Sequence, residues 1–120
     1  MLTAHVALGI SLIVVSLTAA AWGGLAAWRR RPAGRPLAHV IALAQTLLVA
    51  QVGVGLLLLS DGRRAPDRLH YTYGVLALLA VLSPWFYAPA EPRRRLIWFA
   101  VATLLAGALA VRALTTGGLT

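Results

Sequence analysis

The sequence predicts an all-α integral membrane protein in which four transmembrane helices form an antiparallel bundle. Hydrophobic residues make up 60% of the 120 residues and charged residues only 12%, whereas a soluble domain carries about a quarter charged residues. The charges cluster between long apolar runs, and four of these runs reach the roughly 20 residues needed to span a bilayer. We therefore expect a single membrane domain over residues 1–120.

The first two expected spans cover residues 2–28 and 37–59. The first run lacks a positively charged leader and an obvious cleavage site, so we interpret it as a retained helix rather than a signal peptide. It ends at the Arg-rich segment 29–36, where two prolines and a glycine stop the helix. The second run then continues without a break as far as Ser60.

The third and fourth expected spans cover residues 69–88 and 96–114. The third is the shortest, and Pro84 lies in its last turn. Because proline removes a helical hydrogen bond, we expect a kink or a loosened turn there. The fourth span follows the basic segment 91–95.

The distribution of arginine predicts the orientation. The loops after the first and third spans, 29–36 and 91–95, carry seven Arg, and the loop between the second and third spans carries three. Basic residues are enriched in cytoplasmic loops, and all four tryptophans also fall towards the Arg-rich side. We expect a protein of the cell (inner) membrane, in contact with the lipid bilayer, with loops 29–36 and 91–95 cytoplasmic and both termini extracytoplasmic.

The composition excludes several classes of function. All eleven basic residues are Arg, so no Lys can form a Schiff base with retinal. The absence of Cys excludes thiolate metal sites, iron–sulfur clusters and covalent haem attachment. No carboxylate lies within a span, which argues against a proton-coupled transporter. The net charge of +8 comes without a nucleic-acid-binding motif, and no independent catalytic constellation is present, so enzymatic activity stays an open question.

Two histidines share the pattern His-x-x-x-Gly: His5 precedes Gly9, and His70 precedes Gly74. Residues four apart on a helix lie on the same face. The first and third spans run in the same direction, so His5 and His70 are expected at about the same depth, near the outer surface. His39 enters the second span from the inner side, roughly 30 Å away.

The paired histidines favour axial ligation of a haem iron, with one imidazole from each helix. The glycine one turn after each histidine removes a side chain where a flat macrocycle must approach the backbone. Arginine can pair with haem propionates, and tyrosine can add hydrogen bonds or ring contacts at the rim. The candidates for these roles are Arg63, Arg64, Arg68, Tyr71 and Tyr73. The alternative is that both histidines are simply tolerated at helix ends near the interface.

Polar residues inside the second span need partners within the bundle. Gln45 and Gln51 are expected to form interhelical hydrogen bonds or to line a ligand or quinone pocket. Close helix packing is expected at Gly53, Gly55 and Gly107, and Arg112 is expected to reach the outer interface along the fourth span.

The run from Gln51 to Ser60, a polar loop and then Leu69-His70 resembles the repeating half of heme A synthase. That family has two four-helix bundles, each with haem-ligating histidines at the outer ends of two parallel helices and a Gln-x-x-x-Gly helix between them. The resemblance covers about three helices and implies haem ligation by His70 and His5. The acidic residue that the family places one turn before its first histidine is absent here, and only one half is present. Because of these two differences, the resemblance implies a bis-histidine b-type cytochrome architecture rather than hydroxylation of a haem methyl group.

The function expected from the sequence is binding of haem b for electron transfer, in a subunit of a larger respiratory or photosynthetic membrane complex. The alternative is a cofactor-free accessory or structural subunit that packs against other membrane subunits. The colour of the purified protein distinguishes these two hypotheses, because a haem protein is red and a cofactor-free subunit is colourless.

Overall fold

The computed structural model describes residues 2–62, 65 and 68–117, and it is helical, with no strand among these residues. The candidate haem-edge residues Arg63 and Arg64 lie outside the described part of the chain. The helices are α1 (Leu2–Trp28), α2 (Gly34–Ser60), α3 (Leu69–Leu82), α4 (Pro84–Tyr87) and α5 (Pro92–Gly117).

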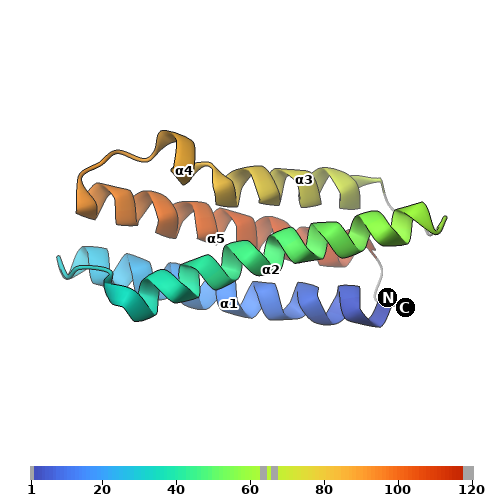
Figure 1. The fold of residues 1–120 in the computed structure, drawn as a ribbon, viewed down its shortest axis with the longest axis horizontal. Helices are drawn as coiled ribbons and strands as arrows, with labels where there is room; N and C mark the ends of the chain where they lie inside the picture. Colours follow the sequence, from blue (N-terminus) through green and yellow to red (C-terminus); the bar gives the residue numbers. More distant parts are fainter. Residues whose placement is uncertain (1, 63–64, 66–67, 118–120) are drawn as a thin grey trace.

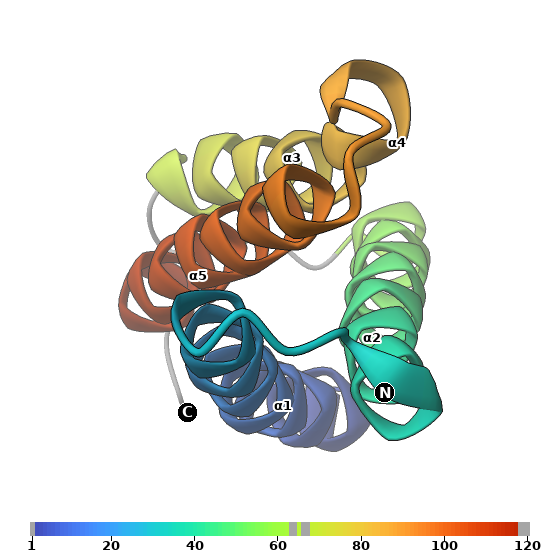
Figure 2. The same ribbon diagram turned by 90° about the vertical axis from the view of Figure 1, so that its left-hand side faces the viewer.

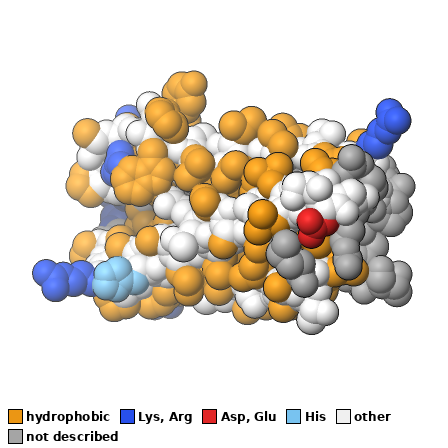
Figure 3. Space-filling model, turned by 45° about the vertical axis from the view of Figure 1, so that its right-hand side comes forward, with side chains coloured by type: hydrophobic (Ala, Val, Ile, Leu, Met, Phe, Trp, Pro, Cys, Tyr) orange, Lys and Arg blue, Asp and Glu red, His pale blue; other side chains and the backbone are white. Residues whose placement is uncertain are grey.

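Four of these segments are long and apolar enough to cross a membrane: Leu2–Trp28, Gly34–Ser60, Leu69–Tyr87 and Pro92–Thr116. Large hydrophobic side chains remain exposed along all four of them; Val14, Leu56 and Leu79 are examples. Figure 3 shows hydrophobic side chains spread along the length of the bundle, with arginines near its two ends. Such an exterior suits a lipid environment, because the bilayer core is as apolar as these side chains. The predicted four-helix membrane bundle is confirmed.

The long helices alternate in direction, as the short connections require (Figure 1). Helix α5 packs extensively against both α1 and α3, α1 packs against α2, and α2 touches α3 over a shorter stretch. Helices α1 and α3 therefore occupy opposite corners of the bundle, with α5 between them on one side, as the end view shows (Figure 2). The start of α1, the end of α2, the start of α3 and the end of α5 meet at one end.

Small residues allow α1 and α5 to approach closely. A Cβ on Gly23 would lie 3.2 Å from Cβ of Ala100, and one on Gly107 would lie 3.3 Å from Cβ of Ser16. Packing of small residues is a principal source of helix association in lipid, where burying apolar surface from water gives no driving force. The close packing expected at Gly107 is confirmed. Gly53 is different: it is exposed, and an added Cβ would meet nothing within 4 Å.

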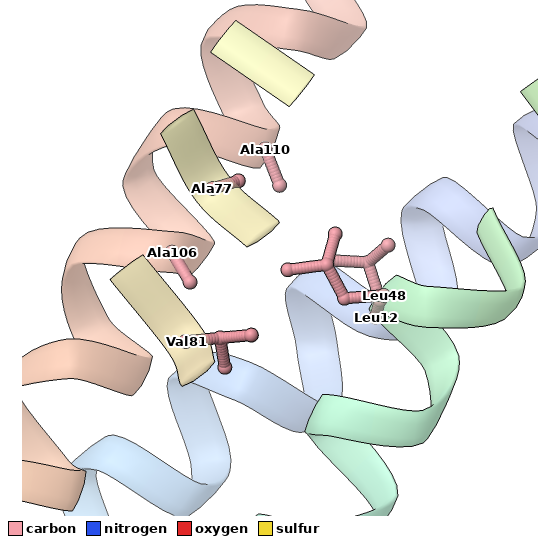
Figure 4. Close-up of a cluster of buried hydrophobic side chains, with 6 residues drawn as sticks. All are labelled: Leu12, Leu48, Ala77, Val81, Ala106 and Ala110. Atoms are coloured by element: carbon pink, nitrogen blue, oxygen red, sulfur yellow. The ribbon is translucent and has the colours of Figure 1, made fainter. Parts of the chain in front are cut away.

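The centre of the bundle holds a cluster to which all four long helices contribute. Its buried members are Leu12, Leu48, Ala77, Val81, Ala106 and Ala110, drawn in Figure 4. The cluster lies between the middle of the bundle and the end where α1 begins. It closes the floor of the cavity described below.

Prolines set two of the helix ends. Helix α3 ends at Leu82, and the chain continues after Ser83 as the single turn α4, which begins at Pro84 and is displaced from the axis of α3 (Figure 1). The break expected at Pro84 is confirmed, since its ring cannot continue the hydrogen-bond ladder. Helix α5 begins at Pro92 instead of residue 96, because proline is well accommodated at the first helical position.

Candidate functional site

The structure brings His5 and His70 together inside one end of the bundle. Their half-buried imidazole rings have centroids 5.8 Å apart and planes inclined by 74°. His5 lies in the first turn of α1 and His70 is the second residue of α3, so these parallel helices present the two rings at the same level. His39 lies in the first turns of α2, at the opposite end of the bundle, and is exposed.

The orientation of His70 is fixed by α5. Its Nδ1 lies 2.6 Å from the backbone carbonyl oxygen of Ala113. A carbonyl oxygen only accepts hydrogen bonds, so Nδ1 is the donor and carries a proton; in the neutral imidazole the lone pair then lies on Nε2. Metal-binding histidines are usually held in this way, by a hydrogen bond from the other ring nitrogen to a carbonyl or carboxylate.

His5 is held between α1 and α2. Nε2 of Gln51 donates a 2.6 Å hydrogen bond to the backbone carbonyl oxygen of His5, which confirms the interhelical bond expected for this glutamine. A Cβ on Gly55 would lie 3.2 Å from Cε1 of His5, so the absent side chain of Gly55 makes room for the imidazole. A Cβ on Gly9 would lie 3.0 Å from Nε2 of Gln51, so the space beside Gly9 is occupied by the glutamine amide.

Two polar atoms at this site are buried without a hydrogen-bond partner, Nδ1 of His5 and Oε1 of Gln51. An unsatisfied buried polar atom costs about 1–3 kcal/mol. Such atoms are rare in native proteins and commonly indicate a missing water, ion or ligand. Both atoms belong to residues that line the cavity around the paired imidazoles, where a bound group or water could reach them.

A cavity of about 370 Å³ surrounds the two histidines. This volume lies within the range of about 300–1,000 Å³ that is typical of small-molecule and cofactor sites. Its walls are mainly aliphatic, and its polar groups are the two imidazoles, Gln51 and Tyr71. The apolar lining comes from α1, α2, α3 and α5, including Leu12, Leu48, Val52, Val75, Ala110 and Leu114.

The other predicted residues lie in different relations to the cavity. Gly74 lines it, and a Cβ there would meet nothing within 4 Å, so the glycine leaves open space. Tyr71 lines it and accepts a hydrogen bond from the backbone N–H of Ala65 at 2.8 Å. Tyr73 packs instead under the guanidinium of Arg112, 5.5 Å from its ring centroid. Arg68 is exposed, two residues before His70.

Two roles at this site were not recognised from the sequence. The carbonyl of Ala113 is a backbone group in an alanine-rich helix and leaves no sequence signal. The role of Gly55 in seating His5 depends on the rotation of α2, which its pattern does not encode. Arg112 was expected to reach the outer interface; it is exposed there, and only its stacking on Tyr73 was not foreseen.

Two histidines alone do not complete the coordination of a metal ion, so the remaining ligand atoms would have to come from a cofactor or solvent rather than from other side chains. Among the described residues no three His, Cys, Asp or Glu side chains are grouped to hold a metal ion. Metal–imidazole bonds are about 2 Å long, so two imidazoles on opposite sides of one metal have ring centres roughly 6 Å apart. The observed 5.8 Å is close to that spacing. The residues present therefore fit a macrocyclic metal cofactor that supplies its own equatorial donors.

The fold and this site define a four-span membrane bundle with a paired-imidazole cavity at one end. Comparison with protein-family models, curated proteins and solved structures finds no match to this chain.

Proposed function

We propose that the protein binds haem b between α1 and α3, with His5 and His70 as axial ligands, and that it transfers electrons. The observation that carries the proposal is the hydrogen bond from Nδ1 of His70 to the carbonyl oxygen of Ala113. This bond orients the His70 ring and leaves Nε2 free to bind a metal, on a ring that lies beside the imidazole of His5. That hydrogen bond would also satisfy a histidine that only packs; the feature that favours a ligand is the unpartnered, buried Nδ1 of His5 beside it.

The rest of the site supports a large, flat and mainly apolar ligand. The cavity walls are aliphatic, and Gly74 leaves open space one turn after His70. Arg68 and Arg112 lie near the same end, the first just before α3 and the second on α5, where they can pair with propionate carboxylates. Tyr71 adds a phenolic hydroxyl at the rim.

The pair of ligands favours electron transfer over oxygen chemistry. Bound haem supplies a one-electron redox couple, and the protein tunes it through axial-ligand identity, burial and hydrogen bonding. If both imidazoles of the pair held the metal of such a cofactor, the protein would leave it no open position for a substrate, and the chemistry supplied would be electron transfer. The Ala113 carbonyl increases the electron density on His70, because a hydrogen-bonded ligand is more basic. Electron transfer needs a donor and an acceptor, so we place the chain within a larger respiratory or photosynthetic membrane complex.

We further propose that the haem end faces the extracytoplasmic side. The opposite end carries seven of the eleven arginines, together with exposed Trp28, Trp85, Phe86 and Tyr87. Excess arginine marks cytoplasmic loops, and aromatic residues gather at membrane interfaces. A C-terminal reporter that is active only in the cytoplasm should be silent; an active reporter would reverse this orientation without moving the site.

The proposed function is tested by the absorption spectrum of the full chain purified in detergent from cells supplied with haem precursor. Haem ligated by two imidazoles should give a red protein with sharp bands in the reduced-minus-oxidised spectrum. A folded, colourless protein that takes up no added haem would contradict the proposal and favour the cofactor-free accessory subunit.

A further inference from the structure

A second cavity, of about 660 Å³, lies at the Arg-rich end of the bundle. It is formed where α1 ends, α2 begins and α5 begins, with Trp85 of α4 at its wall. Its charged and amide-bearing lining residues are Arg30, Arg31, Arg93, Arg95, Glu91 and Gln45. Four guanidinium groups against one carboxylate make this cavity strongly basic.

A buried amide donor in this cavity has no partner. Gln45 is 9% exposed, and its Oε1 accepts a 3.2 Å hydrogen bond from Nε1 of Trp85. An indole nitrogen only donates, so the amide oxygen must face Trp85 and the amide nitrogen must lie on the other side. That nitrogen, Nε2, is buried without an acceptor. The site therefore offers a desolvated N–H group to a ligand with an acceptor oxygen.

Two of the arginines are held in place by other contacts. Nε of Arg93 donates a 2.9 Å hydrogen bond to the backbone carbonyl of Ala27 at the end of α1. The guanidinium of Arg95 lies over two aromatic rings, 5.7 Å from the centroid of Trp85 and 5.3 Å from that of Phe99. Stacked or hydrogen-bonded guanidinium groups lose little further conformational freedom when they bind an oxyanion.

The carboxylate of Glu91 hydrogen-bonds to the backbone rather than to these guanidinium groups. It accepts hydrogen bonds from the backbone N–H groups of Arg93 at 3.1 Å and Arg94 at 2.8 Å, and so caps the start of α5. Among the described residues no arginine of this cavity forms an ion pair within 4.0 Å. Their charge is therefore available to a ligand.

Arg30 adds an unusual backbone conformation. Its φ is +56°, in the left-handed region. The N–H groups of Arg30 and Arg31 bond back to the carbonyls of Ala27 at 3.1 Å and Ala26 at 2.8 Å. This is the Schellman pattern, in which glycine is the preferred residue at the left-handed position. A side chain in this region is strained; the chain retains it and thereby keeps a fourth guanidinium at the cavity.

We propose that this cavity binds the phosphodiester headgroup of an anionic phospholipid from the adjoining leaflet. The arginines and the N–H of Gln45 match phosphate oxygens, and buried Ile41, Leu96 and Phe99 form an apolar wall for the acyl chains. A lipid is favoured over free phosphate because the cavity lies at the end of the membrane spans, where basic pockets between helices bind anionic headgroups. A quinone would suit the free amide but leaves four cations without a partner.

The test uses the full chain in neutral detergent, with thermal unfolding and native mass spectrometry as readouts. Phosphatidylglycerol should raise the unfolding temperature and remain bound in the mass spectrum, whereas phosphatidylcholine and inorganic phosphate should not. Arg95→Gln should weaken phosphatidylglycerol binding at least tenfold, the loss expected when one charge-assisted hydrogen bond is removed. Arg94→Gln is the matched control, because Arg94 is its neighbour and does not line the cavity.

A second variant, Arg30→Gly, should change stability and lipid binding in opposite directions. The glycine relieves the left-handed strain, so the lipid-free protein should unfold at a higher temperature while phosphatidylglycerol binding weakens.

Equal losses of phosphatidylglycerol binding in Arg94→Gln and Arg95→Gln would overturn the proposal, because they indicate nonspecific attraction between surface charges and lipid. An equal shift with inorganic phosphate would identify a soluble anion as the ligand, and stabilisation by quinone but not by phosphatidylglycerol would also refute a lipid site.

Discussion

Nδ1 of His70 donates a hydrogen bond to the carbonyl oxygen of Ala113 across the interface between α3 and α5. This 2.6 Å contact fixes both the tautomer and the tilt of the imidazole. It links the imidazole on one helix to the backbone of its neighbour, so the geometry of the site depends on how α3 and α5 pack. The contact also separates two roles of His70, because Nδ1 serves the bundle and Nε2 remains for a cofactor.

His70→Asn separates these two roles experimentally. The asparagine amide nitrogen lies near the position of Nδ1 and can still donate to Ala113, but nothing replaces Nε2. We expect its unfolding free energy to stay near that of the haem-free wild type, while His70→Ala loses about 0.5–1.5 kcal/mol with the hydrogen bond. Haem binding should be lost in both variants. Chemical denaturation and haem content, measured on the same samples, check this pair.

Gly55 and Gly53 form a matched pair on α2. A Cβ on Gly55 would be 3.2 Å from His5, whereas one on Gly53 meets nothing within 4 Å. Gly55→Leu should displace the imidazole, destabilise the bundle by about 1–3 kcal/mol through overpacking and reduce haem content. Gly53→Leu should leave haem content unchanged and raise the helix propensity by up to about 1 kcal/mol. Equal haem content in the two variants would show that the position of His5 does not matter for binding.

Gly74 tests the open side of the cavity. No protein atom lies within 4 Å of the position that its Cβ would occupy. Gly74→Leu should therefore fold without a helix–helix clash, and its side chain should fill space intended for the macrocycle. We expect thermal stability at or above that of the wild type without haem, and a marked loss of haem content. Full haem occupancy in Gly74→Leu would rule out a macrocycle against this turn.

The number of spans and their approximate limits could be predicted because length and composition alone define a membrane helix. The break at Pro84 could also be predicted from the sequence, since it follows from the missing N–H group of proline. The rotation of each helix about its own axis could not be predicted. The spans are apolar on all sides, so no periodic pattern shows which face lies inside, and the partner of Gly9 and the contact of Gly55 with His5 could not be foreseen.

The same limit applies to the sites. Helix direction alone was enough to expect His5 and His70 at one end and His39 at the other. The Ala113 carbonyl could not be inferred, because backbone acceptors carry no residue identity. The cavity at the Arg-rich end was also missed, because arginines in loops were explained completely by the orientation rule. Their convergence with Gln45 depends on three helix ends meeting in space.

Glu91 gives a prediction about pH. The backbone N–H groups of Arg94 and Arg93 donate to its carboxylate and, with the nearby guanidinium charges, lower the pKa of this exposed group. A lowered folded-state pKa means that the ionised form stabilises the fold. The contribution is complete above the unfolded-chain pKa of about 4.3 and is lost as the pH falls through the lower folded-state pKa.

Glu91→Ala should therefore unfold at a lower temperature than the wild type at pH 7, and the difference should shrink in acid. Thermal unfolding of both proteins between neutral and acidic pH checks this prediction. A difference that stays constant across the acidic range would show that the cap does not depend on the charge of Glu91.

The most direct test of the central claim is the haem-to-protein ratio in three single variants, His5→Ala, His70→Ala and His39→Ala, purified in parallel with the wild type. The account predicts that the first two lose the bis-imidazole spectrum and most of the haem, while His39→Ala, changed at the opposite end of the bundle, keeps both. Wild-type haem content in folded His5→Ala and His70→Ala, or a loss confined to His39→Ala, would contradict it.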